Sequence, residues 1–216
     1  GVAVGVAVFL SIRLANQQTM MSFTESVDLV LGRANAVIRV EGLDFDESVF
    51  EKLHTLRHEI KAYPVIEGYG VESTSGEVIE IIGTDLLQDS GIRDFSIKTV
   101  EKDLKGLLPL LLDPSGIILP EKFIPGTHFA PGDTLQLLIK GKEKSFNVNA
   151  VLENTGIAKA LNGNFALMDI AAAQIVFEKI GRLDRIDIQF LNPVDFELMR
   201  KKIAALLPEF MKVERP

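Results

Sequence analysis

The sequence predicts an α+β protein with helices on one face of a sheet. A β-rich segment is inserted between the two halves of this α+β part, and a long N-terminal helix comes before the first half. Three observations support this fold class. Strand-like and helix-like periodicities alternate over residues 34–84, and the same alternation returns over 164–216. Between them, residues 85–163 contain more proline and glycine and several short strand-like runs. We therefore expect a first half, an inserted β-rich subdomain and a second half, in that order.

The first stretch, residues 1–33, is expected to be the end of a transmembrane helix followed by a stalk helix. It opens with ten residues that carry no polar side chain, and residues 6–31 contain neither proline nor glycine. A membrane-spanning helix needs about 20 apolar residues, so these ten resemble the outer half of one. A buried core helix is the alternative, because apolar runs of this length also occur inside proteins.

A narrow stripe continues from the apolar head along the stalk at helical spacing. It predicts that the stalk packs against a neighbouring helix, and Asn16 resembles the polar residue that fixes the register of helix pairs. The stripe consists of Phe9, Asn16, Met20, Phe23 and Val27.

Composition narrows the class of protein. The chain has 216 residues and is 47% hydrophobic, which allows one large domain or two small ones with an ample core. It has no cysteine, which excludes thiol catalysis, cysteine-ligated zinc, iron–sulfur clusters and disulfides. The formal net charge of −7 argues against nucleic acid as a partner, because nucleic acid selects a basic face.

The first half begins with a strand over residues 36–41, where side chains alternate between two faces. A helix is expected to run from an N-cap at Asp46 to about Lys61. Strands over 63–72 and 77–83 then form a hairpin. The buried stripe of the helix is expected to be Val49, Leu53, Leu56 and Ile60.

The inserted segment is expected to contain a short helix over residues 98–108 and a set of short strands. A turn at 113–116 leads into one strand, and residues 134–140 and 145–152 form a hairpin around a glycine. The leucine run at 107–112 is either buried in the core or exposed as an apolar patch.

The second half starts with a strand over residues 165–168. Asp169 is expected to cap a helix that runs to Ile180, and Gly181 to end it. A further strand, over 185–190, follows from another alternation of side chains.

The chain is expected to end with a helix and a short strand. Asn192 is the predicted N-cap, with Pro193 at the first helical position. Residues 210–215 then return towards the start of the domain as a strand. The buried stripe of this helix is expected to be Val194, Leu198, Ile203 and Leu206.

One group of residues has the spacing of a metal site. Glu51, His54 and His58 would place two imidazoles and a carboxylate on one side of the first helix. The predicted buried stripe lies on the other side, so we interpret these residues as a solvated face. His128 lies in a Pro/Gly loop, and no metalloprotease, serine hydrolase or phosphate-loop motif occurs. We therefore predict no catalytic, cofactor or metal site.

Other charged groups are also interpreted structurally. Asp169 is explained as a helix cap, and Asp184 and Arg185 as charges at a strand end. The tip of the predicted hairpin carries lysines that we expect to form a solvated edge, with contact to lipid headgroups as the alternative: Lys140, Lys142 and Lys144.

Five segments together resemble the extracytoplasmic core domain of FtsX-like permeases, the family that includes MacB-type and lipoprotein-releasing ABC transporters. They are GVAVGVAVFLSIRLA, GRANAVIRVEG, GIILPEKF, PGDTLQLL and, as the most specific, FALMDIAAAQIVFEKIGRLDRIDIQF. The resemblance covers nearly the whole chain. The residues that we single out in the last segment, the signature segment, are Asp169, Gln174, Gly181, Arg182, Asp184 and Arg185.

The resemblance implies a porter-like α+β part that a β-rich subdomain interrupts, placed after the first of four transmembrane helices. It implies a non-enzymatic domain on the periplasmic side of the cell inner membrane. Its role would be to relay ATP-driven conformational change to a substrate or partner protein. The implied partners are a cytoplasmic ATPase subunit and a second permease copy, with a periplasmic adaptor, a lipoprotein or a lipid as further candidates.

Two other classes of protein stay open at this point. One is the ligand-binding extracytoplasmic sensor domain of a membrane receptor, and the other is a membrane-anchored enzyme. A permease would continue into three further apolar spans, whereas a sensor would continue into one span and a signalling helix.

Overall fold

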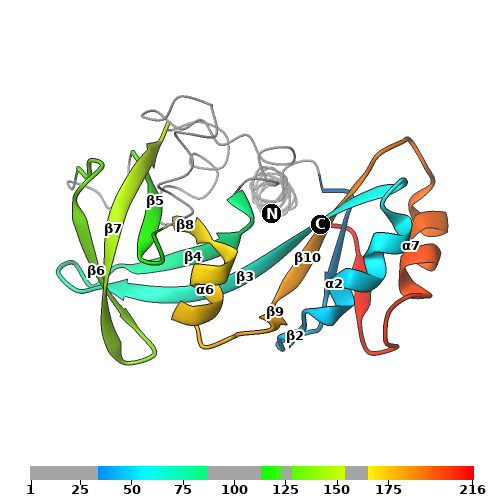
Figure 1. The fold of residues 1–216 in the computed structure, drawn as a ribbon, viewed down its shortest axis with the longest axis horizontal. Coiled ribbons are helices and arrows are strands. Elements are labelled where there is room, and N and C mark those ends of the chain that lie inside the picture. The colour runs from blue at the N-terminus through cyan, green and yellow to red at the C-terminus, as the bar shows by residue number, and fades with distance from the viewer. Residues whose placement is uncertain (1–33, 87–112, 122, 124–127, 154–164) are drawn as a thin grey trace, which may run out of the picture.

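Figure 1 shows a computed structural model of the chain, which describes residues 34–86, 113–121, 123, 128–153 and 165–216. The predicted stalk, the predicted helix at 98–108 and the leucine run at 107–112 lie outside the described residues. Over the described part, the chain is a mixed α+β domain with a nine-stranded sheet, a two-stranded sheet and three α-helices. None of these described helices has the length and hydropathy to cross a membrane.

Six of the nine strands close into a ring. Their order is β3 (Ile60–Glu72), β4 (Val78–Thr84), β8 (Phe165–Asp169), β5 (Gly116–Pro120), β7 (Lys142–Leu152) and β6 (Thr134–Ile139). β6 pairs again with β3, which closes the ring. The division of the chain into subdomains at residues 84 and 163 stays a prediction. In the ring, β8 of the predicted second half pairs with β4 of the predicted first half and with β5 of the predicted insertion.

The other three strands form an open wing on the first half of β3. β10 (Arg185–Phe190) pairs with β3, and β1 (Ala36–Arg39) lies between β10 and β11 (Lys212–Glu214). Figure 1 shows α2 (Ser48–Leu53) and α7 (Phe196–Ala204) beside the wing, at the opposite end from β6 and β7. α6 (Ile170–Val176) packs on β3, β4 and β8 of the ring, and β2 (Phe45–Asp46) pairs with β9 (Arg182–Leu183).

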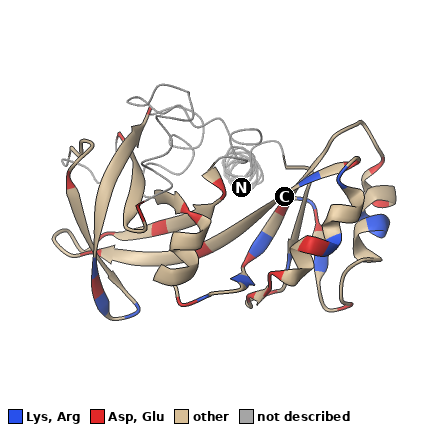
Figure 2. Cartoon of the chain, in the orientation of Figure 1, with Lys and Arg blue, Asp and Glu red and all other residues tan. Residues whose placement is uncertain are grey.

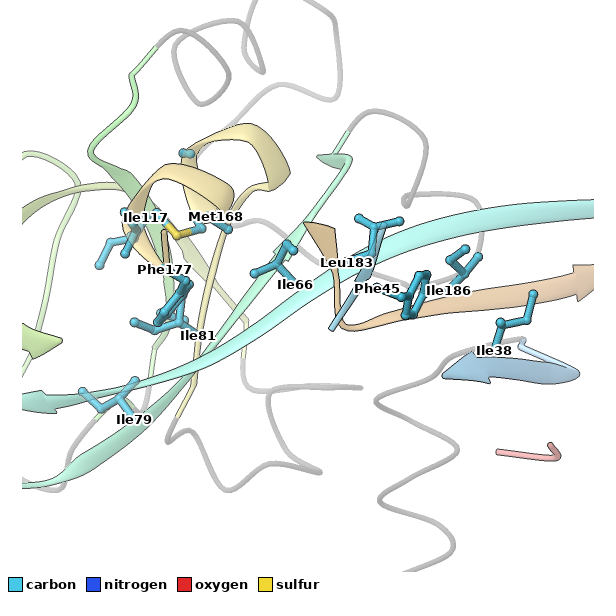
Figure 3. Packing of buried hydrophobic residues seen from close by; sticks show 14 of the residues in the cluster. Ile38, Phe45, Ile66, Ile79, Ile81, Ile117, Met168, Phe177, Leu183 and Ile186 are labelled. Atoms are coloured by element: carbon cyan, nitrogen blue, oxygen red, sulfur yellow. The ribbon is translucent and has the colours of Figure 1, made fainter. Parts of the chain in front are cut away.

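One hydrophobic cluster runs through ring and wing. Figure 3 shows it continuing from Ile117 in the ring and Phe177 at the end of α6 to Ile38 in the wing. Two glycines let α6 approach the ring closely. A Cβ atom on Gly83 would lie 2.1 Å from the Cβ of Ala173. A Cβ atom on Gly68 would lie 2.1 Å from the aromatic side chain of Phe177.

The strands agree well with the prediction, but the first helix is shorter than predicted. Its N-cap is Glu47, not Asp46, although the Asp46 carboxylate accepts a hydrogen bond from the Ser48 N–H at 2.9 Å. α2 ends at Leu53, and a 3-10 turn, η1 (His54–Leu56), follows. Ile60 belongs to β3, where it pairs with Phe190 of β10. Pairing with the wing therefore overrides the helical pattern at this residue.

The last helix begins later than predicted. Asp195, not Asn192, is its N-cap and accepts a hydrogen bond from the Leu198 N–H at 3.0 Å. The buried residues of α7 are Met199 and Ile203. Two members of the predicted stripe, Val194 and Leu198, are instead exposed.

The helix of the signature segment begins as predicted and ends early. Asp169 is its N-cap, and its carboxylate accepts a hydrogen bond from the Ala171 N–H at 2.9 Å. The helix ends at Val176, before the predicted end at Ile180. The final strand is confirmed, because β11 pairs with β1.

Candidate functional site

The signature segment crosses from the ring to the wing. It leaves β8, forms α6 and enters β10, and its side chains meet the loop before α2 and the middle of β3. Figure 2 shows acidic and basic residues interleaved along this connection. We call the set of contacts the polar junction: Asp44, Glu47, Glu67, Gln174, Lys179, Arg182, Asp184, Arg185 and Asp187.

The first part of the polar junction fixes the loop before α2. Arg182 donates from Nε and Nη2 to one carboxylate oxygen of Asp44, at 2.8 and 2.6 Å, and from Nη2 to the Asp44 carbonyl at 2.8 Å. Gln174 donates to the Glu47 carboxylate at 2.8 Å and to the Arg182 carbonyl at 3.2 Å. The Gly181 carbonyl accepts from the Glu47 N–H at 3.0 Å. Gly181 has a φ of +73°, which glycine adopts without strain.

The second part fixes the middle of β3. Lys179 forms an ion pair with Asp184, with an Nζ to Oδ1 distance of 2.6 Å, and also donates to the Glu67 carbonyl at 3.1 Å. Asp184 accepts a hydrogen bond from the Glu67 N–H at 2.7 Å. Burial raises the pKa of Asp184, and the Lys179 ammonium opposes this effect only in part. Asp184 lies immediately before β10, where a strand-end charge was predicted, and its half-buried carboxylate also links the signature segment to β3.

The third part is buried. Arg185 donates from Nε to Asp187 Oδ1 at 2.9 Å and also pairs with the Glu67 carboxylate. The side chain of Asp187 is 0% exposed and that of Arg185 13% exposed. A buried carboxylate is costly unless it is paired, so Arg185 is needed at this position for stability.

The polar junction consists of ion pairs and hydrogen bonds that connect the ring to the wing. The cationic side chains of Lys179, Arg182 and Arg185 are each bonded to a carboxylate. The bonds connect segments of both halves that lie far apart in the sequence. A shallow depression of about 480 Å³ opens above them. This arrangement is suited to holding ring and wing in one orientation.

Lys140 and Lys142 of the β6–β7 hairpin lie on an exposed edge, as predicted, and Lys144 is half-buried. The ammonium groups of these lysines also contact residues at the end of α6. Lys140 and Lys144 donate to the carbonyl oxygens of Phe177 and Val176, at 2.5 and 2.9 Å. Lys142 forms an ion pair with Glu178 at 3.0 Å. Cations at a helix C-terminus satisfy carbonyl groups that have no partner within the helix. The tip of the β6–β7 hairpin therefore packs against the C-terminal end of α6 through these lysines.

The proposed solvated face is exposed as predicted. Glu51, His54 and His58 all lie at the surface, and among the residues that the structure describes no group of three acidic or histidine side chains is arranged to hold a metal ion. Glu51 and His54 line an open groove of about 740 Å³ between α2 and β3, with Phe50 and Tyr63.

The structure brings together Gln174, Gly181, Arg182, Asp184 and Arg185 of the signature residues, whereas Asp169 caps the N-terminal end of α6. The stalk stripe lies outside the described residues. The partners of the signature residues were missed from the sequence: Asp44, Glu47, Glu67 and Lys179. The first three lie more than a hundred residues from the side chains that they contact. No local periodicity connects positions so far apart.

Comparisons with known proteins identify the fold. The periplasmic region of MacB from Actinobacillus actinomycetemcomitans matches with a TM-score of 0.60 and 11% sequence identity, over 89% of this chain and 93% of that chain. The extracellular domain of the ABC-type transporter YknZ from Gram-positive bacteria matches with a TM-score of 0.57 and 13% identity, over 84% of this chain and 100% of that chain. The chain has the fold of these two domains. No family model and no curated protein matches it.

Proposed function

We propose that the chain is the extracytoplasmic domain of an FtsX-like, MacB-type ABC transporter permease. The observation that carries the proposal is the fold, which covers 93% of the periplasmic region of MacB and 100% of the extracellular domain of the ABC-type transporter YknZ. On this proposal the domain stands on the periplasmic side of the inner membrane and is not an enzyme. It relays ATP-driven conformational change to a substrate or a partner protein.

The ends of the domain support this proposal. Val37 of β1 pairs with Glu214 of β11, so the chain enters and leaves the domain on neighbouring strands. Arg39 and Glu214 also form an ion pair at 2.8 Å across these strands. A domain inserted between two membrane helices needs its two connections close together. Movement of both helices would therefore act on the single strand pair β1–β11.

Strand β3 supplies a path from the wing to the far end of the ring. It is 13 residues long, and at about 3.3 Å per residue it spans roughly 40 Å. It pairs with β10 in the wing and with β4 and β6 in the ring. The polar junction fixes its middle at Glu67. In the proposed mechanism, β3 and the polar junction make the wing and the ring move together as one rigid body.

The stalk completes the proposed mechanism. Residues 1–33 would join the domain to the first membrane helix, and their stripe would pack on a helix of the same permease or of its second copy. The remaining proposed partners are a cytoplasmic ATPase subunit and, outside the cell membrane, an adaptor, a lipoprotein or a lipid.

Purification of the full-length protein from native membranes tests this assignment. We expect an ABC-type ATPase subunit to copurify in fixed proportion, with ATP hydrolysis that vanadate inhibits. A tagged, unrelated membrane protein from the same cells is the control. A preparation without ATP hydrolysis, or one that phosphorylates its own histidine, would contradict the assignment and favour a sensor.

A further inference from the structure

The outer face of the ring carries an apolar patch at one end. Tyr69 and Val71 point outward from β3, because the alternate residues Gly68 and Gly70 face Phe177 and the ring interior. Val71 pairs with Val78 of β4 on one side and with Leu138 of β6 on the other, so all four side chains lie on one face. We call this set the outer patch: Tyr69, Val71, Val78 and Leu138.

The exposure of the outer patch is unusual for side chains that meet one another. Tyr69 is 65% exposed, Val78 57% and Leu138 44%. Single exposed apolar residues are normal, but contiguous ones across three strands are typical of an interaction surface. Figure 1 places the β3–β4 turn and β6 at the end of the molecule away from the C-terminus.

Carboxylates form the rim of the outer patch. Glu80 lies directly opposite Tyr69 on the neighbouring strand, and Glu143 lies directly opposite Leu138. Glu80 is half-buried, and within the described ranges no lysine or arginine forms an ion pair with it. The lysines of the same hairpin lie on the other side, at the end of α6. The rim is therefore acidic.

The charge of the rim selects among possible occupants. An anionic lipid surface would be repelled by Glu80 and Glu143. A second copy of this chain, placed symmetrically, would bring the same carboxylates face to face. A partner with an apolar strip between lysine or arginine residues would instead bury the patch and neutralise the rim.

We propose that the outer patch is a docking surface for a partner protein that presents an apolar segment flanked by lysine or arginine. The apolar side chains supply the buried contact, and Glu80 and Glu143 fix its orientation. This inference rests on the geometry of one face and does not depend on the transporter assignment.

A model peptide tests the proposal directly. The probe is a helical amphipathic peptide of leucine and lysine, compared with a peptide in which glutamate replaces every lysine. Each is titrated into the ¹⁵N-labelled chain and followed by NMR. We expect saturable shifts confined to β3, β4 and β6 with the lysine peptide, and none with the glutamate peptide.

Substitutions then locate the site. Val78→Ser with Leu138→Ser should weaken binding about tenfold. Leu198→Ser, which changes another exposed leucine, on α7, should not change it. Glu80→Gln with Glu143→Gln should weaken it about threefold at low salt.

Glu80→Gln is not expected to weaken the fold. Burial raises the pKa of Glu80. Its contribution to stability is therefore complete below its unfolded-state pKa and is lost as the pH rises through the folded-state value. At neutral pH the uncharged glutamine should fold at least as well, so weaker binding would not reflect unfolding.

The opposite results would overturn the proposal. Equal binding of the two peptides, shifts centred on another face, or affinity that Val78→Ser with Leu138→Ser leaves unchanged would each do so. Binding of the chain to anionic vesicles through the outer patch would identify a lipid surface instead. Self-association through the same residues, seen by sedimentation, would identify a second copy.

Discussion

Replacing Gly83 by alanine is expected to lower the free energy of unfolding by about 3 kcal/mol, the upper part of the range for overpacking a core. The added Cβ would lie 2.1 Å from the Cβ of Ala173 in α6. A Cβ atom is bonded directly to the backbone, so no side-chain rotation can move it away. The Cβ of Ile66, at 3.3 Å, blocks the other direction. Either α6 or β4 must shift. Urea denaturation of the chain measures the change.

A second substitution provides the matched control. Gly83→Ala combined with Ala173→Gly moves the methyl group from the helix to the strand and removes the clash. Glycine inside a helix costs about 1 kcal/mol, so the double variant should recover more than half of the loss. A Gly83→Ala variant as stable as the parent, or a double variant no better than the single one, would show that α6 does not sit this closely on β4.

Replacing Arg185 by methionine is expected to destabilise the chain by about 3 kcal/mol, because it removes a partner from the buried carboxylate of Asp187. Methionine keeps most of the volume of the side chain, so the effect reports on charge and hydrogen bonding. The loss should appear as a lower midpoint in urea with little change in slope.

Neutralising the carboxylate is the control for this change. Arg185→Met with Asp187→Asn should be more stable than Arg185→Met alone, since an amide is less costly to bury than a charge. Arg200→Met should cost less than 1 kcal/mol, because Arg200 pairs with Glu197 at an exposed site. Equal losses for Arg185→Met and Arg200→Met would mean that the polar junction is not a buried joint.

The sequence predicts the strands well because their signals are local. Residues 185–190 alternate side chains, and β10 occupies that range. The lysine and glycine at the β6–β7 turn both have positive φ, as a tight hairpin requires. Helix ends are predicted less well. The choice between Asn192 and Asp195 as N-cap depends on which residue of α7 faces the core, which only the packed wing decides.

Only one side of the contacts in the polar junction could be predicted from the sequence. The signature segment supplies Arg182, Asp184 and Arg185, and their charges are visible in the sequence. Their partners Asp44 and Glu67 come from the other half of the chain, and tertiary packing alone brings them near. Lys140 and Lys144 illustrate the same limit, because they donate to backbone carbonyls at the end of α6, which no side-chain pattern reveals.

The proposed relay predicts that the domain moves when nucleotide binds on the other side of the membrane. Residues 1–216 contain no cysteine, so one cysteine can carry a spin label at a chosen position. Lys201 is exposed on α7, away from the polar junction and the outer patch. Ser22→Pro, in the predicted stalk helix, is the variant expected to uncouple the domain, and Ser22→Ala is its matched control.

The most direct measurement is the distance between the labels of two Lys201→Cys copies, by pulsed electron spin resonance, in the full permease with its ATPase in lipid nanodiscs. We predict that ATP with vanadate shifts the distance distribution, that Ser22→Ala keeps the shift, and that Ser22→Pro abolishes it while ATP still binds. Identical distributions with and without nucleotide, in a preparation whose ATP hydrolysis vanadate blocks, would contradict the proposal that this domain relays movement.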